Sequence, residues 1–312
     1  MLLEEAAEDR RYATWNALVN KRLEALGARV RSLVSDRAQA LIQRAEQGLE
    51  CLSIPDVFPL MHDIVKRYAL AIGRQMKRAL QDLETAEARL QRHQGGDAQG
   101  AAPREATRQV EAAHPEVKRW EGLPRAYRPR LETISLTLHP FRSDDSAPQT
   151  SQEVDNRVQA QVQAIEALAQ THQLPDRQTM MKKVTKHVPA LAALVDFWWA
   201  GVHQDLEHAA ISPLWRTWAQ EALRPMVYWK HQVTRTRCAR RKTIMQRALE
   251  GGQAIFAQHT MPQGLPRHVR EDWHAWATRQ VQAFQRASSA VEGRNGALAH
   301  RHHNQRGLPK QR

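Results

Sequence analysis

The chain has 312 residues, and 46 Lys and Arg against 33 Asp and Glu give it a formal net charge of +13 at pH 7. This length allows one or two domains with a sizeable core, and the positive charge favours polyanionic partners through counterion release. The two cysteines, Cys51 and Cys238, argue against a disulfide scaffold and a zinc site. No window approaches the roughly 18 apolar residues of a membrane span and no secretory leader is visible, so we expect a cytoplasmic protein without a membrane partner.

The N-terminal part alternates between helix and strand patterns. Apolar side chains at three-and-four spacing predict an amphipathic helix over residues 10–27, ended by Gly27. Short apolar runs predict strands near residues 2–7, 29–35 and 50–54. This order is typical of a parallel α/β sheet. Asp36 follows the second strand, at the edge where open α/β sheets bind ligands.

The remainder favours helices. A long helical pattern covers residues 56–92, and residues 93–107 lack large apolar side chains and predict a flexible linker. Residues 131–141 alternate in the manner of a strand, whereas most of 152–300 predicts helix. Seven tryptophans fall on helical segments in this part of the chain. Core packing is the simpler interpretation for most of them, and base stacking is the alternative.

A basic run lies between Glu221 and Glu250, where no acidic residue occurs. Its eight cations are Arg224, Lys230, Arg235, Arg237, Arg240, Arg241, Lys242 and Arg247. On one continuous helix, Arg237, Arg240 and Arg241 would share a face suited to phosphates. A solvated helix whose acids lie elsewhere is the alternative. The residues expected to bind DNA are Arg235, Arg237, Arg240, Arg241, Lys242 and, in the C-terminal tail, Arg294, Arg301 and Arg306.

Two carboxylates are candidates for metal chemistry, Asp36 and Glu292. Glu292 lies in the segment 286–296, on the expected first turn of a helix capped by Ser289. Each has a simpler interpretation, because an acid at a helix start is favoured by the macrodipole and Ser289 with Glu292 fits a capping box.

These segments, together with Cys51–Phe58, His62–Lys66 and His302–Pro309, resemble bacterial insertion-sequence transposases of the Asp-Asp-Glu, ribonuclease-H-like kind. The resemblance implies an α/β fold, a partial ribonuclease-H-like sheet with a large, predominantly α-helical insertion. It makes Asp36 and Glu292 two of three catalytic, metal-binding carboxylates. Such sites cleave and join DNA strands with two Mg²⁺ (or Mn²⁺) ions. The first aspartate of the triad would precede residue 1, so we expect DNA binding without cleavage.

The resemblance also implies a domain order. Residues 1–92 would form a partial α/β core, 93–107 a linker, 108–287 a helical insertion, and 288–312 the helix carrying Glu292 with a basic tail. The expected function is that of a transposase-like protein. The two alternatives are a non-catalytic, basic, helical DNA-binding protein and a nonfunctional relic of a transposase. DNA is the expected partner, and a homo-oligomer is left open.

Overall fold

The computed structural model describes residues 12–35, 39–55, 57–93, 100–174, 178–209, 211–259 and 264–284. Helices account for 82% of the structure, and the sheet in these ranges has two strands. The prediction of a ribonuclease-H-like α/β fold is therefore wrong for the described residues. The predicted strand at 2–7 lies outside them. In the described residues beyond 55, apolar side chains recur at helical spacing, so their burial is completed by other helices and no further strand joins the sheet there.

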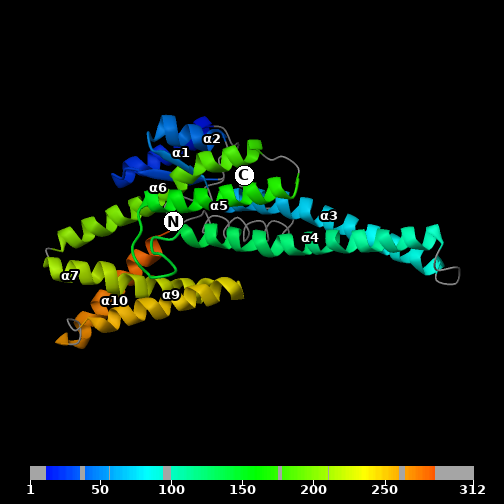
Figure 1. Ribbon diagram of the computed structural model, residues 1–312. Helices are drawn as coiled ribbons and strands as arrows, with labels where there is room; N and C mark the ends of the chain where they lie inside the picture. Colours follow the sequence, from blue (N-terminus) through cyan, green and yellow to red (C-terminus); the bar gives the residue numbers. More distant parts are fainter. Residues whose placement is uncertain are drawn as a thin grey trace, which may run out of the picture. The chain divides into compact units, whose positions relative to one another are not determined.

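Figure 1 shows the arrangement of the elements within each part of the chain. The strands are β1 (Ser32–Ser35) and β2 (Leu52–Pro55). The helices are α1 (Tyr12–Leu26), α2 (Gln39–Gln43), the π-helical turn η1 (Arg44–Gly48), α3 (Val57–His93), α4 (Ala101–Thr137), α5 (Ser151–Thr171), α6 (Gln178–His208), α7 (Pro213–Trp218), the π-helical turn η2 (Ala219–Leu223), α8 (Arg224–Arg235), α9 (Ala239–Gln258) and α10 (Arg267–Ala283).

The chain divides into two compact units, and neither is one continuous segment. Unit 1 comprises Met1–Leu60, Leu138–Asp155 and His187–Arg312. Unit 2 comprises Met61–Thr137 and Asn156–Lys186. This division follows spatial contacts, and it cuts across the segments 1–92 and 108–287 that the sequence predicts.

A small parallel β-α-β element forms the N-terminal part of unit 1. Strands β1 and β2 pair in parallel, with Ser32 opposite Leu52 and Ser35 opposite Pro55. The predicted strands near 29–35 and 50–54 are thus confirmed in position and direction. Helix α1 also follows the prediction, and Gly27 ends it with a φ of 58°, a value that glycine adopts without steric cost.

The helical part of unit 1 packs around an aromatic cluster. Phe141, Trp198, Trp199, Tyr228 and Trp229 are all buried. Phe141 contacts the rings of both Trp198 and Trp199, with centroids 5.7 and 5.5 Å away. Core packing is therefore confirmed for these tryptophans and for Trp218, whereas Trp215, Trp273 and Trp276 are half-buried.

Unit 2 is built on two 37-residue antiparallel helices, α3 and α4, with α5 beside them (Figure 1). The buried Tyr127 hydroxyl donates to the carbonyl of Ile64 at 2.9 Å and its ring contacts Tyr68, with centroids 5.6 Å apart. Residues 101–107, predicted as linker, and 131–137, strand-like in sequence, both belong to α4. Ala106 and Ile134 are both buried, so each of these segments contributes apolar side chains to the helix packing of unit 2.

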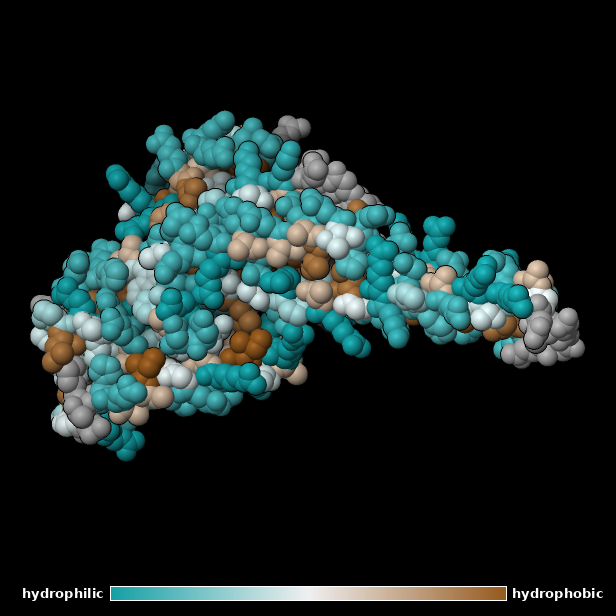
Figure 2. Space-filling model, in the orientation of Figure 1, coloured by the Kyte–Doolittle hydropathy of each residue, from teal (hydrophilic) through white to brown (hydrophobic). Residues whose placement is uncertain are grey.

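Most of the visible surface is hydrophilic, with scattered apolar side chains (Figure 2). Large apolar residues that stay exposed include Val65, Leu70, Leu80 and Leu214. Within the described ranges, no helix combines the length and the apolar character needed to cross a bilayer.

Candidate nucleic-acid interface

The basic run forms a surface at the connection between α8 and α9 in unit 1. Helix α8 ends at Arg235 and α9 begins at Ala239, because Thr236 and Cys238 adopt extended backbone conformations with ψ of 119° and 112°. The predicted continuous helix through 224–247 is therefore wrong. We call the five cations around this break the basic junction: Arg235, Arg237, Arg240, Arg241 and Lys242.

The basic junction is accessible to a ligand. Four of its five cations are exposed, and Arg241 is half-buried. Arg235 lies in the last turn of α8, Arg237 in the connection, and the other three in the first turn of α9. The break thus spreads the charges over both helix ends instead of along one helical face.

Packing between α8 and α9 fixes the position of the junction. Gly252 on α9 approaches the backbone of Met226 on α8 so closely that an added Cβ would lie 3.3 Å from its Cα atom. The Thr236 hydroxyl hydrogen-bonds Met245 Sδ at 3.2 Å, which ties the connection to α9. The Ser146 hydroxyl donates to the carbonyl of Ala248 at 2.8 Å, anchoring α9 to the loop before α5.

Two titratable side chains at the break have shifted pKa values to which its cations contribute. Hydrogen bonds from the backbone N–H and the guanidinium of Arg241 lower the pKa of the Cys238 thiol. Partial burial and then the charge of Arg235 lower the pKa of His231, whose Nε2 lies 3.4 Å from Arg235 Nη1. The thiolate form of Cys238 is favoured and the cationic form of His231 is disfavoured. Arg241 thus accounts for the Cys238 shift, whereas the His231 shift comes first from burial and only second from the charge of Arg235.

The start of α9 adds a positive potential at the break. Backbone N–H groups in the first turn of a helix point outward, and the macrodipole places partial positive charge there. Arg240, Arg241 and Lys242 therefore stand where cations are disfavoured by about 0.3–1 kcal/mol each. An anion bound at this end would relieve that repulsion.

Arg224 does not belong to this surface, although the sequence counts it among the eight cations. Its side chain is fully buried, with the guanidinium carbon 4.2 Å from the centroid of the Trp199 ring and 5.2 Å from that of Trp198. Its Nε donates to the carbonyl of Ala219 at 3.3 Å, while Nη1 and Nη2 have no hydrogen-bond partner among the described residues. Burial holds the pKa of Arg224 well below its usual value.

The two predicted catalytic residues, Asp36 and Glu292, lie outside the described residues. Strand β1 ends at Ser35, one residue before Asp36. The tail cations Arg294, Arg301 and Arg306 are also outside the described ranges. Within those ranges, no group of three or more His, Cys, Asp or Glu side chains is placed to hold a metal ion. The Mg²⁺ site thus stays a prediction from the resemblance.

The sequence alone did not identify Cys238 as a thiol whose pKa is lowered by Arg241 at the junction. The signal is present in Arg237-Cys238-Ala239-Arg240-Arg241, a thiol surrounded by cations. Only the helix break, however, makes Cys238 the residue that precedes α9 and brings its sulfur to the backbone N–H of Arg241.

Comparison with known proteins gives one finding for this region. Residues 219–312 match DUF6399, a family of unknown function. The match includes α8, α9 and α10, and therefore the whole basic junction, but it spans less than a third of the chain. No curated protein and no solved structure matches the chain.

Proposed function

We propose that the chain binds the phosphate backbone of DNA through the basic junction. The observation that carries this proposal is the gathering of five cations within residues 235–242, on the surface and next to a helix N-terminus. Guanidinium groups match phosphate oxygens with paired donors, and lysine adds a point charge. A duplex phosphate is thus the chemical group that best fits this surface.

Backbone contacts of this kind position a protein on DNA without reading its sequence. We therefore propose binding of low sequence specificity with a steep salt dependence. If all five cations contact phosphates, the logarithm of the association constant should fall with the logarithm of salt concentration with a slope of about −4.5. Fewer contacts give a proportionally shallower slope.

A matched pair of triple variants tests the proposal. The first replaces Arg237, Arg240 and Lys242 with alanine. The second replaces three exposed cations of unit 2, Arg92, Arg104 and Arg108, with alanine. Both lose the same net charge, so any difference between them reports the location of the bound DNA.

Fluorescence anisotropy with a labelled duplex, measured over a series of salt concentrations, gives the slope for each protein. We expect the junction variant to lose up to about 2.7 units of slope, about 0.9 for each contact removed. The unit 2 variant should keep most of the wild-type slope. Equal losses in the two variants would show that only net charge matters and would overturn the placement.

Transposase-like strand cleavage, with Asp36 and Glu292 as metal ligands, remains a further proposal that rests on the sequence resemblance. A cytoplasmic location is likewise a proposal, and it rests on the two cysteines, which show no disulfide pattern. DNA binding by the basic junction does not depend on either, because the cations that carry it all lie within the described residues.

A further inference from the structure

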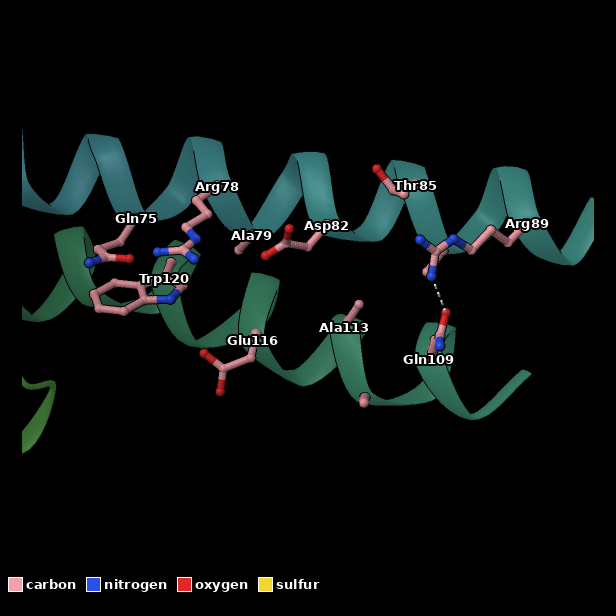
Figure 3. A pocket seen from close by; sticks show the side chains of 12 residues that line it. Gln75, Arg78, Ala79, Asp82, Thr85, Arg89, Gln109, Ala113, Glu116 and Trp120 are labelled. Carbon is pink, nitrogen blue, oxygen red and sulfur yellow. Dashed lines mark hydrogen bonds between the residues drawn. The ribbon is translucent and has the colours of Figure 1, made fainter. Parts of the chain in front are cut away.

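Unit 2 contains an open groove between α3 and α4, shown in Figure 3. Its volume is about 620 Å³. Small side chains, among them Ala79 and Ala86 of α3 and Ala113 of α4, form its apolar part. Larger polar side chains stand around them: Gln75, Arg78, Asp82, Arg89, Gln109 and Glu116.

The groove begins where α5 ends. Helix α5 runs antiparallel to α4, as shown by the hydrogen bonds from Arg130 to Gln161 at 3.2 Å and from Arg119 to His172 at 3.4 Å. The chain then turns at Gln173, whose φ is 52°. Figure 1 shows α3 and α4 continuing well past this point.

The part of α4 from Ala101 to Arg119 is therefore not covered by α5. This length corresponds to about 28 Å of helix. The proximal half of the hairpin has large aromatic side chains in its interface, Tyr68, Trp120 and Tyr127. Trp120 also lines the proximal end of the groove, and beyond it the groove is lined by alanines and polar groups. The distal half of the hairpin therefore lacks the third helix that α5 supplies to the proximal half.

The charges around the groove sum to zero, because Arg78 and Arg89 are balanced by Asp82 and Glu116. Arg89 donates to Gln109 at 3.1 Å, and Glu116 pairs with Arg119 at 3.3 Å. Arg78 and Asp82, in contrast, have no ion-pair partner among the described residues. A neutral surface on a chain with a net charge of +13 does not suit a nucleic acid, and it permits two copies of the chain to approach.

We propose that this groove is a self-association surface, on which the distal α3–α4 hairpins of two copies pack face to face in antiparallel orientation. Arg78 and Asp82 lie one helical turn apart on α3. A two-fold axis between them places each Arg78 opposite the partner's Asp82, so one pair of residues forms two equivalent contacts. The product is a four-helix bundle.

The dimensions agree with a weak, reversible dimer. The uncovered hairpin face is about 28 Å long and about two helix diameters, roughly 20 Å, wide. Such a face has a projected area of about 560 Å², so two copies would bury about 1,100 Å² in total, at the low end of specific interfaces. The second copy is favoured over a different partner because the charge pattern is complementary to itself.

Charge reversal tests the proposal without nucleic acid, and so independently of the proposed function. Sedimentation velocity on the full chain should show a monomer–dimer equilibrium. Arg78→Asp or Asp82→Arg alone places like charges opposite each other twice per dimer, and each should weaken association by about 10-fold or more. The exposed Lys77, on another face of α3, supplies the control variant Lys77→Asp, which should associate like the wild type.

Two restoring experiments make the test specific. The double variant Arg78→Asp with Asp82→Arg exchanges the charges and should recover dimerisation. An equimolar mixture of the two single variants should form heterodimers, although each alone is weakened. Circular dichroism establishes that every variant is folded. A wild type that stays monomeric at all concentrations, single variants that dimerise normally, or folded single variants that fail to recover on mixing would each overturn the proposal.

Discussion

Replacing Arg240 and Lys242 with glutamate should change stability and DNA affinity in opposite directions. The two residues occupy the second and fourth positions of α9, and both side chains are exposed. As cations they oppose the macrodipole of the helix, and as glutamates they would favour it. The same change removes two of the five cations that we propose as phosphate contacts.

The expected gain in stability follows from the helix-end term. A charge in the first turn contributes about 0.3–1 kcal/mol, and reversing its sign doubles the change. Two positions give about 1–4 kcal/mol, and solvent screening at these exposed sites brings the expected increase in the free energy of unfolding to about 1–2 kcal/mol. The salt slope of DNA binding should fall by at least about 1.8 units, the value for two lost contacts.

Urea denaturation followed by circular dichroism measures the first quantity, and anisotropy titrations across salt concentrations measure the second. Arg247→Glu supplies the control, because Arg247 is an exposed cation two turns into α9, beyond the range of the helix end. It should leave stability nearly unchanged. If the double variant loses stability while Arg247→Glu does not, the cations at the start of α9 are structural and the proposed phosphate site is wrong.

Three further outcomes are expected. Arg224→Met removes a buried charge, so the variant should be as stable as the wild type or more stable by about 1–3 kcal/mol. Arg224→Ala leaves a cavity and should cost about 2–4 kcal/mol of stability. Urea denaturation measures both changes, and a large loss of stability in the methionine variant would show that the stacked guanidinium is needed. Iodoacetamide should alkylate Cys238 at lower pH than Cys51, because Arg241 lowers the pKa of the first thiol and burial raises that of the second; mass spectrometry of the labelled peptides decides the order. The chain should bind plasmid DNA without Mg²⁺-dependent nicking, and nicking abolished by Asp36→Asn or Glu292→Gln would contradict the expectation that a carboxylate is missing.

The correct predictions depend on local apolar patterns. The spacing of Tyr12 to Leu26 and the positive φ of Gly27 define α1, and short apolar runs define β1 and β2. The predicted α/β fold class is wrong because a pair of strands does not determine whether further strands or helices pack beside it. The same two strands could belong to a large sheet or to an isolated β-α-β element. The helical packing of the residues after 55 determines which of the two forms.

At the candidate interface, the sequence showed where the cations lie along the chain, but not that the helix breaks between them or that Arg224 is buried. No glycine or proline marks the break at Thr236–Cys238, so periodicity alone suggests one helix. The burial of Arg224 could have been inferred from α8 itself, where Tyr228 lies one turn away on the same face and is also fully buried. A charged residue in such a position is normally assigned to the surface, and here the aromatic rings of Trp198 and Trp199 replace the solvent.

The interleaving of the two units along the chain has a consequence for the order of folding during synthesis. The last segment of unit 2 ends at Lys186, whereas unit 1 requires α10, nearly 100 residues later. Unit 2 can therefore close on the ribosome while unit 1 is still missing most of its aromatic cluster. Three of the four crossings between units fall inside the continuous helices α3, α5 and α6. Melting one unit must therefore either break a helix internally or spread into the other, which couples their unfolding.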